Sequence, residues 1–106
     1  MQELYNHFNR TGYSKINWCT NLDVINARRK VFDDIKTVEE KPNPNRRCAN
    51  YPLRTFEYKD FRFVETLNTR AGDRGDLYYV PTGELVATDA DFYNFNTFVC
   101  WFYNFR

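Results

Sequence analysis

The sequence has few of the residues that carry most enzyme chemistry. One histidine and four glycines occur among 106 residues, without a glycine-rich phosphate loop or a G-x-S-x-G motif. His7 has no visible partner for catalysis or metal binding, and the aspartates between residues 73 and 91 match no calcium-loop spacing. No set of acid, base and nucleophile emerges, so we expect a protein without catalytic residues, bound metal or cofactor.

Cysteine is also scarce, and its spacing is uninformative. Cys19, Cys48 and Cys100 cannot all pair within one chain and form no C-x-x-C motif. Residues 1–10 are too polar for a secretory signal, so we expect reduced thiols in a soluble cytoplasmic protein. No apolar run approaches the roughly 20 residues that span a bilayer, which predicts no membrane partner.

Net charge is close to zero, but its distribution is uneven. The formal charge is +1, which gives no general attraction to nucleic acid or to anionic membranes. Residues 28–62 contain ten basic and six acidic side chains, whereas residues 63–105 contain two basic and six acidic ones. The two parts can attract each other on folding, or they can form a dipolar surface with one basic patch for a partner.

Aromatic residues are abundant, at 19% of the chain, and they concentrate in residues 89–106. Phe92, Phe95, Val99 and Phe102 recur at helical spacing, and Thr88 or Asp89 can cap a helix. The odd positions from 93 to 105 are nearly all aromatic or β-branched, which is typical of a strand. We expect a helix, because the capping residues and the preceding hairpin favour it, and we expect the rest of the chain to pack on it.

Residues 21–40 carry the clearest helical pattern. Thr20 or Asn21 can cap it, and one apolar stripe follows, widened by Ile25 and Phe32 and formed by Val24, Ala27, Val31, Ile35 and Val38. The pattern predicts an amphipathic helix whose charged face is solvated. A role for Arg28, Arg29 and Lys30 in binding an anion is the functional alternative.

Strands are predicted in the second half of the chain. Residues 53–67 are predicted to be strand, but the alternation of aromatic side chains changes phase between Tyr58 and Phe61. Either a hairpin turn at Lys59-Asp60 or a β-bulge can produce this change. Residues 68–76 read as a flexible loop, and residues 77–80 and 84–87 form a hairpin around Pro81-Thr82-Gly83. A short helical turn is expected over residues 1–8, ended by Thr11-Gly12. These elements predict one α+β domain: an antiparallel sheet of three to five strands, one main amphipathic helix and an aromatic C-terminal segment.

Two predicted loops carry the best candidates for a binding site. Residues 41–52 hold three of the four prolines, and long loops are often functional. Arg46, Arg47 and Tyr51 in this loop, with Arg70 and Arg74 in the second, suit the surface of a partner protein, because Tyr and Arg are enriched at interface hot spots. We therefore expect a non-catalytic protein-binding module. A short chain rich in Asn and aromatics also suits phage or viral proteins that block a host enzyme or defence complex.

One stretch partly resembles a nucleic-acid-binding motif. Residues 59–65, Lys-Asp-Phe-Arg-Phe-Val-Glu, resemble the RNA-stacking strand of the RRM fold, although Asp60 and Arg62 replace its small residues. The alternative function is single-stranded nucleic-acid binding, through stacking on Phe61 and Phe63 and contacts from Arg54 and Arg62. A structural subunit that forms a homo-oligomer is a third reading.

Overall fold

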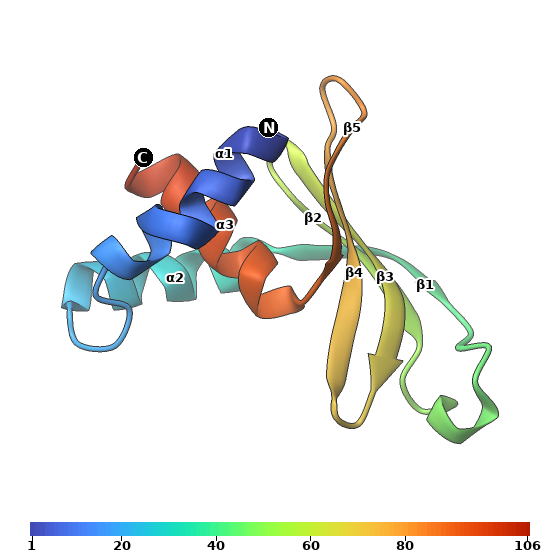
Figure 1. Ribbon diagram of the computed structural model, residues 1–106. Coiled ribbons are helices and arrows are strands. Elements are labelled where there is room, and N and C mark those ends of the chain that lie inside the picture. The colour runs from blue at the N-terminus through green and yellow to red at the C-terminus, as the bar shows by residue number, and fades with distance from the viewer.

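A five-stranded antiparallel sheet forms one layer of the structure and three helices form the other (Figure 1). The computed structural model describes residues 1–106 in full. The strands follow one another in sequence order and are β1 (Lys36–Lys41), β2 (Leu53–Tyr58), β3 (Phe61–Thr69), β4 (Gly72–Tyr79) and β5 (Glu84–Ala90). The helices are α1 (Gln2–His7), α2 (Leu22–Asp34) and α3 (Phe92–Asn104). The predicted α+β class is confirmed, with the aromatic C-terminal segment as a helix.

Helix α3 is the centre of the core. Phe95 stacks on Phe63 of β3, with ring centroids 5.3 Å apart and planes 6° from parallel. Every residue from 95 to 101 is buried, so α3 is enclosed by the sheet and the other helices on nearly all sides. This enclosure explains why its sequence fits two periods: a helix that is apolar all round has no single stripe. Its cap is Asp91, whose Oδ1 accepts from the Asn94 N–H at 2.7 Å, and not Thr88 or Asp89 as predicted.

Helix α1 packs beside α3 through aromatic contacts. The Tyr5 ring lies 5.0 Å from Phe98, and the Phe8 ring lies 5.1 Å from Trp101. The predicted break at Thr11-Gly12 is wrong, because the backbone stays helical to Lys15, through a π-helical turn (Phe8–Gly12) and a 3₁₀ turn (Tyr13–Lys15). Gly12 is buried, and a Cβ there would lie 3.3 Å from Phe8 Cδ1. The glycine thus serves close packing rather than termination.

Helix α2 begins as predicted and ends earlier. The Asn21 side chain accepts from the Asp23 N–H at 3.0 Å, which confirms the cap. The helix stops at Asp34, and the next residues form β1, so the prediction of helix to residue 40 is wrong in its last part. Val38, assigned to the apolar stripe, is 50% exposed on that strand. Backbone pairing with β2 outweighed a helical pattern that Ile35 and Val38 extend by coincidence.

Three tight hairpins join β2 to β5. The predicted Lys59-Asp60 turn is present, with Lys59 at φ 49°, so the hairpin and not the bulge is correct. Residues 68–76 are not a loop: only Arg70 and Ala71 stand between β3 and β4, because the backbone groups on either side pair in register. The turn at Pro81-Thr82-Gly83 is confirmed, with Gly83 at φ 73°.

The helices cover one face of the sheet and leave the other open (Figure 1). Phe61, Phe63 and Leu77 point to the helices and have no exposed surface. On the opposite face, Arg62 pairs with Glu57 at 2.7 Å. The edge strand β1 is exposed along its whole length and is rich in charge, which discourages pairing with another edge.

The cysteines and the helix lengths complete the description. All three cysteines are free, and Cys100 is buried within α3. The longest helices, α2 and α3, have 13 residues each, and no helix combines the length and apolarity needed to cross a bilayer.

Candidate functional site: an arginine–aromatic face

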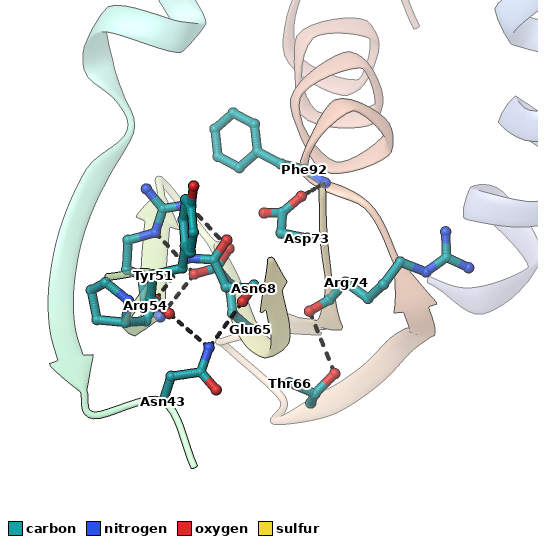
Figure 2. Close-up of polar contacts among 10 residues, drawn as sticks. Asn43, Tyr51, Arg54, Glu65, Thr66, Asn68, Asp73, Arg74 and Phe92 are labelled. Atoms are coloured by element: carbon teal, nitrogen blue, oxygen red, sulfur yellow. Dashed lines mark hydrogen bonds and ion pairs between the residues drawn. The ribbon is translucent and has the colours of Figure 1, made fainter. Parts of the chain in front are cut away.

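The two predicted arginine loops lie at the same end of the sheet (Figure 1). Two asparagines hold them together. Asn43 donates from Nδ2 to the carbonyls of Tyr51 and Asn68, at 2.8 and 2.9 Å, and Asn68 donates to the Pro52 carbonyl at 2.8 Å (Figure 2). Asn68 stands two residues before Arg70. The loop of residues 42–52 is therefore fixed beside the β3–β4 turn.

Arg46 and Arg47 are exposed in a 3₁₀ turn, η3 (Arg46–Cys48). Asn45 caps this turn, with its side chain accepting from the Arg47 N–H at 3.0 Å. Neither arginine forms a salt bridge, and Tyr51, near the end of the same loop, is half-buried. The turn thus presents two free guanidinium groups on a capped backbone.

Arg70 and Arg74 have different surroundings. Arg70 is exposed in the β3–β4 turn. Arg74 is paired with Asp89, with Nε 3.1 Å from Oδ1 and Nη2 3.2 Å from Oδ2, and this contact lowers the pKa of Asp89. In Figure 2 the Arg74 side chain points away from the polar cluster around Glu65. Arg70 therefore lies at the same end of the sheet as Arg46 and Arg47, whereas Arg74 belongs to a separate ion pair.

The residues proposed for nucleic-acid stacking do not share one surface. Phe61 and Phe63 have no exposed area, so neither ring can stack on a base. Arg62 lies on the open face of the sheet, and Arg54 is held by Glu65 on the helix side. Alternating side chains of a strand point to opposite faces, which separates these groups.

A buried polar cluster that includes Glu65 and Asp73 lies close to the β3–β4 turn (Figure 2). The Asp73 Oδ1 accepts from the Phe92 N–H at 3.3 Å, and its Oδ2 is buried without a partner. Burial and the neighbouring Glu65 raise the pKa of Asp73 to about 6. A proton on Asp73 would give that oxygen a hydrogen bond to donate to Glu65.

Sequence reasoning missed a groove between α2 and α3. The groove has a volume of about 360 Å³ and is lined by Arg28, Arg29, Phe32, Asp33, Phe92, Tyr93 and Asn96. A second hollow of about 470 Å³ runs from Phe32 and Phe92 to Arg70. We call the two hollows together the arginine–aromatic face, with Arg28, Arg29, Phe32, Tyr93 and Arg70 as its exposed or half-exposed side chains.

Large aromatic rings are accessible on this face. Phe32 is 60% exposed and Tyr93 is 44% exposed, although the core contains many fully buried rings. The Phe32 and Phe92 rings meet edge to face with centroids 6.1 Å apart. The Arg28 guanidinium lies 5.6 Å from the centre of the Tyr93 ring, a cation–π contact. Tyr93 is also fixed by a 2.6 Å hydrogen bond between its hydroxyl and that of Tyr13.

Comparisons with known proteins add no function to this geometry. No protein-family model, no curated protein and no solved structure matches the chain. Within the structure, no three His, Cys, Asp or Glu side chains gather as metal ligands would.

Proposed function

We propose that this protein is a non-catalytic binding module that acts by occupying the surface of a partner protein with its arginine–aromatic face. The observation that carries the proposal is the position of Phe32, 60% exposed and shared by the two hollows. Complete burial of one aromatic side chain removes about 150–250 Å² from water. Phe32 keeps 60% of its surface exposed, so a partner that covers it removes the larger part of such an area and gains a central anchor. Arg28, Arg29 and Arg70 surround it, and Arg with aromatics is the usual composition of a hot spot.

The face is also supported by rigid elements. Tyr93 and Phe92 stand on the first turn of α3, the helix that the core encloses, and Phe32 stands on α2. A preorganised surface loses less conformational entropy on binding than a loop does. The loop with Arg46 and Arg47 is held by asparagine hydrogen bonds beside the β3–β4 turn, which carries Arg70 of this face.

Nucleic-acid binding and self-association are the alternatives that the test must separate. Phosphate contacts weaken steeply with salt because counterion release loses its advantage, whereas an aromatic-anchored protein interface changes less. A homo-oligomeric subunit would sediment as an oligomer at micromolar concentration. The target class that the composition suggests is a host enzyme or defence complex, as bound by small phage or viral proteins.

The proposal is tested by affinity capture from a lysate of the source cell or its host, with and without nuclease. Wild type is compared with Phe32→Ser, and the matched control is Val80→Ser, because Val80 is also an exposed apolar side chain, at the β4–β5 turn. We expect one stoichiometric protein that survives nuclease and salt, is lost with Phe32→Ser and is kept with Val80→Ser. Equal loss in both variants, or recovery of nucleic acid alone, would reject the proposal.

A further inference from the structure

The groove between α2 and α3 contains an unpaired amide at its base. Asn96 is 5% exposed, lines the groove, and its side chain makes no hydrogen bond with the rest of the protein. The other buried asparagine, Asn68, is 7% exposed and donates to the Pro52 carbonyl. The one fully enclosed side-chain polar atom without a partner is Asp73 Oδ2, so the Asn96 amide is still reached through the groove. A ligand that enters the groove can therefore bond to Asn96 without breaking a hydrogen bond within the protein.

The rim of the same groove is positively charged and unpaired. Arg28 and Arg29 line it, and neither forms a salt bridge. Asp33 stands four residues after Arg29, yet the two are not ion-paired. Two guanidinium groups beside a single carboxylate favour an anionic occupant, and Arg binds carboxylates through parallel hydrogen bonds.

The walls of the groove are aromatic. Phe32, Phe92 and Tyr93 line it, and its volume of about 360 Å³ lies within the range of about 300–1,000 Å³ that is usual for ligand pockets. Phe32 and Phe92 are close to perpendicular, at 87°, so they offer an edge and a face rather than a parallel slot. Such walls suit an inserted aromatic side chain better than a base stacked between two rings.

We propose that the groove takes a Tyr or Trp side chain from a partner protein, on a segment where acidic residues flank that aromatic. The inserted ring packs on Phe32, Phe92 and Tyr93, and its O–H or N–H donates to the Asn96 carbonyl oxygen. The flanking carboxylates bind Arg28 and Arg29. This inference rests on the proposed function and names the chemistry of the segment that the face recognises.

The test uses the purified full chain and three acetylated, amidated five-residue peptides. The probe has a central tryptophan with two glutamates on each side; one control has lysines in place of the glutamates, and the other has serine in place of the tryptophan. Titrations are followed by ¹H–¹⁵N NMR, which resolves the Asn96 side-chain amide. We expect the probe alone to shift that amide and the backbone signals of residues 28–33 and 92–96. No shift at millimolar probe, or equal shifts with the lysine peptide, would overturn the proposal.

Variants locate the binding to the groove. Asn96→Leu keeps the size of the side chain and removes its hydrogen bonds, and we expect at least tenfold weaker probe binding with an unchanged fold. Arg28→Ala with Arg29→Ala should weaken binding as much, while Lys30→Ala, exposed on the same helix, should not. If Asn96→Leu does not fold, the arginine comparison decides, and equal binding by the Arg28→Ala with Arg29→Ala variant and by Lys30→Ala would refute the proposal.

The two proposals can fail separately. Because the peptides need no lysate, a partner captured through Phe32 without probe binding would keep the proposed function and reject the acidic aromatic segment. Probe binding that Arg28→Ala with Arg29→Ala abolishes would support the groove even where lysate capture fails.

Discussion

Arg54 holds Glu65 through two parallel hydrogen bonds, with Nε 2.9 Å from Oε1 and Nη2 3.2 Å from Oε2. The Arg54 backbone N–H also donates to Oε1 at 2.8 Å. The Glu65 side chain has no exposed surface, whereas that of Arg54 keeps 35%. This pair joins β2 to β3 beneath the second hollow of the arginine–aromatic face.

Removing the guanidinium should destabilise the fold. Arg54→Ala leaves a buried carboxylate with the backbone bond alone, and we expect a loss of about 2–3 kcal/mol in the free energy of unfolding. The matched control is Arg62→Ala, whose pair with Glu57 lies on the open sheet face and should contribute less than about 1 kcal/mol. Urea unfolding at pH 7 measures both, and equal losses would contradict the buried position of Glu65.

Stability should depend on pH through Asp73. Its pKa is about 6 in the folded protein and about 3.9 in unfolded chains, so the folded state holds a proton that the unfolded state releases. The contribution of Asp73 is therefore fully present below pH 4 and is lost as pH rises through 6. We expect about 1 kcal/mol, because the side chain is only partly buried and solvent screens it.

Asp73→Asn tests this dependence. The variant keeps an uncharged side chain at every pH, so wild type should lose stability relative to it between pH 4 and 7. Carboxylates that do not contact Asp73 titrate in both proteins and cancel in the difference between their unfolding free energies. A difference that stays constant over this range would show that Asp73 titrates normally.

Replacement of glycine by alanine should reduce stability by different amounts at Gly75 and Gly83. A Cβ at Gly75 would lie 2.5 Å from the Val64 carbonyl oxygen and 2.8 Å from Phe63 Cζ, whereas a Cβ at Gly83 meets nothing within 4 Å. Gly75→Ala should cost about 3 kcal/mol or more through overpacking. Gly83→Ala should cost about 1 kcal/mol, because its φ of 73° is strained for alanine. Thermal melts of the two variants check the order, and a milder effect at Gly75 would refute the close approach of β3 and β4.

Cys19 and Cys100 should react with a thiol reagent at different rates. Cys19 is exposed, while burial in α3 raises the pKa of the Cys100 thiol to about 11. Since the thiolate is the reactive form, iodoacetamide at pH 8 should modify Cys19 first and Cys100 only after denaturation. Peptide mass spectrometry over a time course reads out each site, and rapid labelling of Cys100 in the folded protein would place it outside the core.

The arginines of η3 should serve binding and not folding. Arg46→Ala with Arg47→Ala should abolish or strongly weaken partner capture, because both guanidinium groups are exposed and free of salt bridges. Surface substitutions of this kind usually change stability by no more than about 0.5 kcal/mol. If the double variant loses capture and its melting temperature also falls strongly, these residues would be structural instead.

The fold class could be predicted from the sequence because its signals are local. The Asn21 cap, the Pro81–Gly83 turn and the aromatic spacing of residues 92–102 each act within a few residues. The end of α2 could not be predicted in this way, since Ile35 fits a helical stripe. What ends the helix is the pairing of β1 with β2, which joins residues far apart in the chain. The same holds for residues 68–76, whose glycines suggest a loop while their backbone pairs in a ladder.

The candidate site was only partly readable from the sequence. Arg46, Arg47 and Arg70 were identified by residue type, but their common position depends on the long-range bond from Asn43 to Asn68. The groove was missed because Phe32 was assigned to the core-facing stripe. One signal was present: Phe32 stands four residues after Arg28 and three after Arg29, on the flank of the helix that those arginines occupy.

The most direct test of the central claim is site-specific photo-cross-linking in a lysate of the source cell or its host. p-Benzoylphenylalanine replaces Phe32 in one protein and Tyr78, on the open sheet face opposite the helices, in the other. We expect position 32 to cross-link to one protein and position 78 to give no product. A cross-link at position 78 alone, or a product at position 32 that contains nucleic acid, would contradict the arginine–aromatic face as a protein-binding surface.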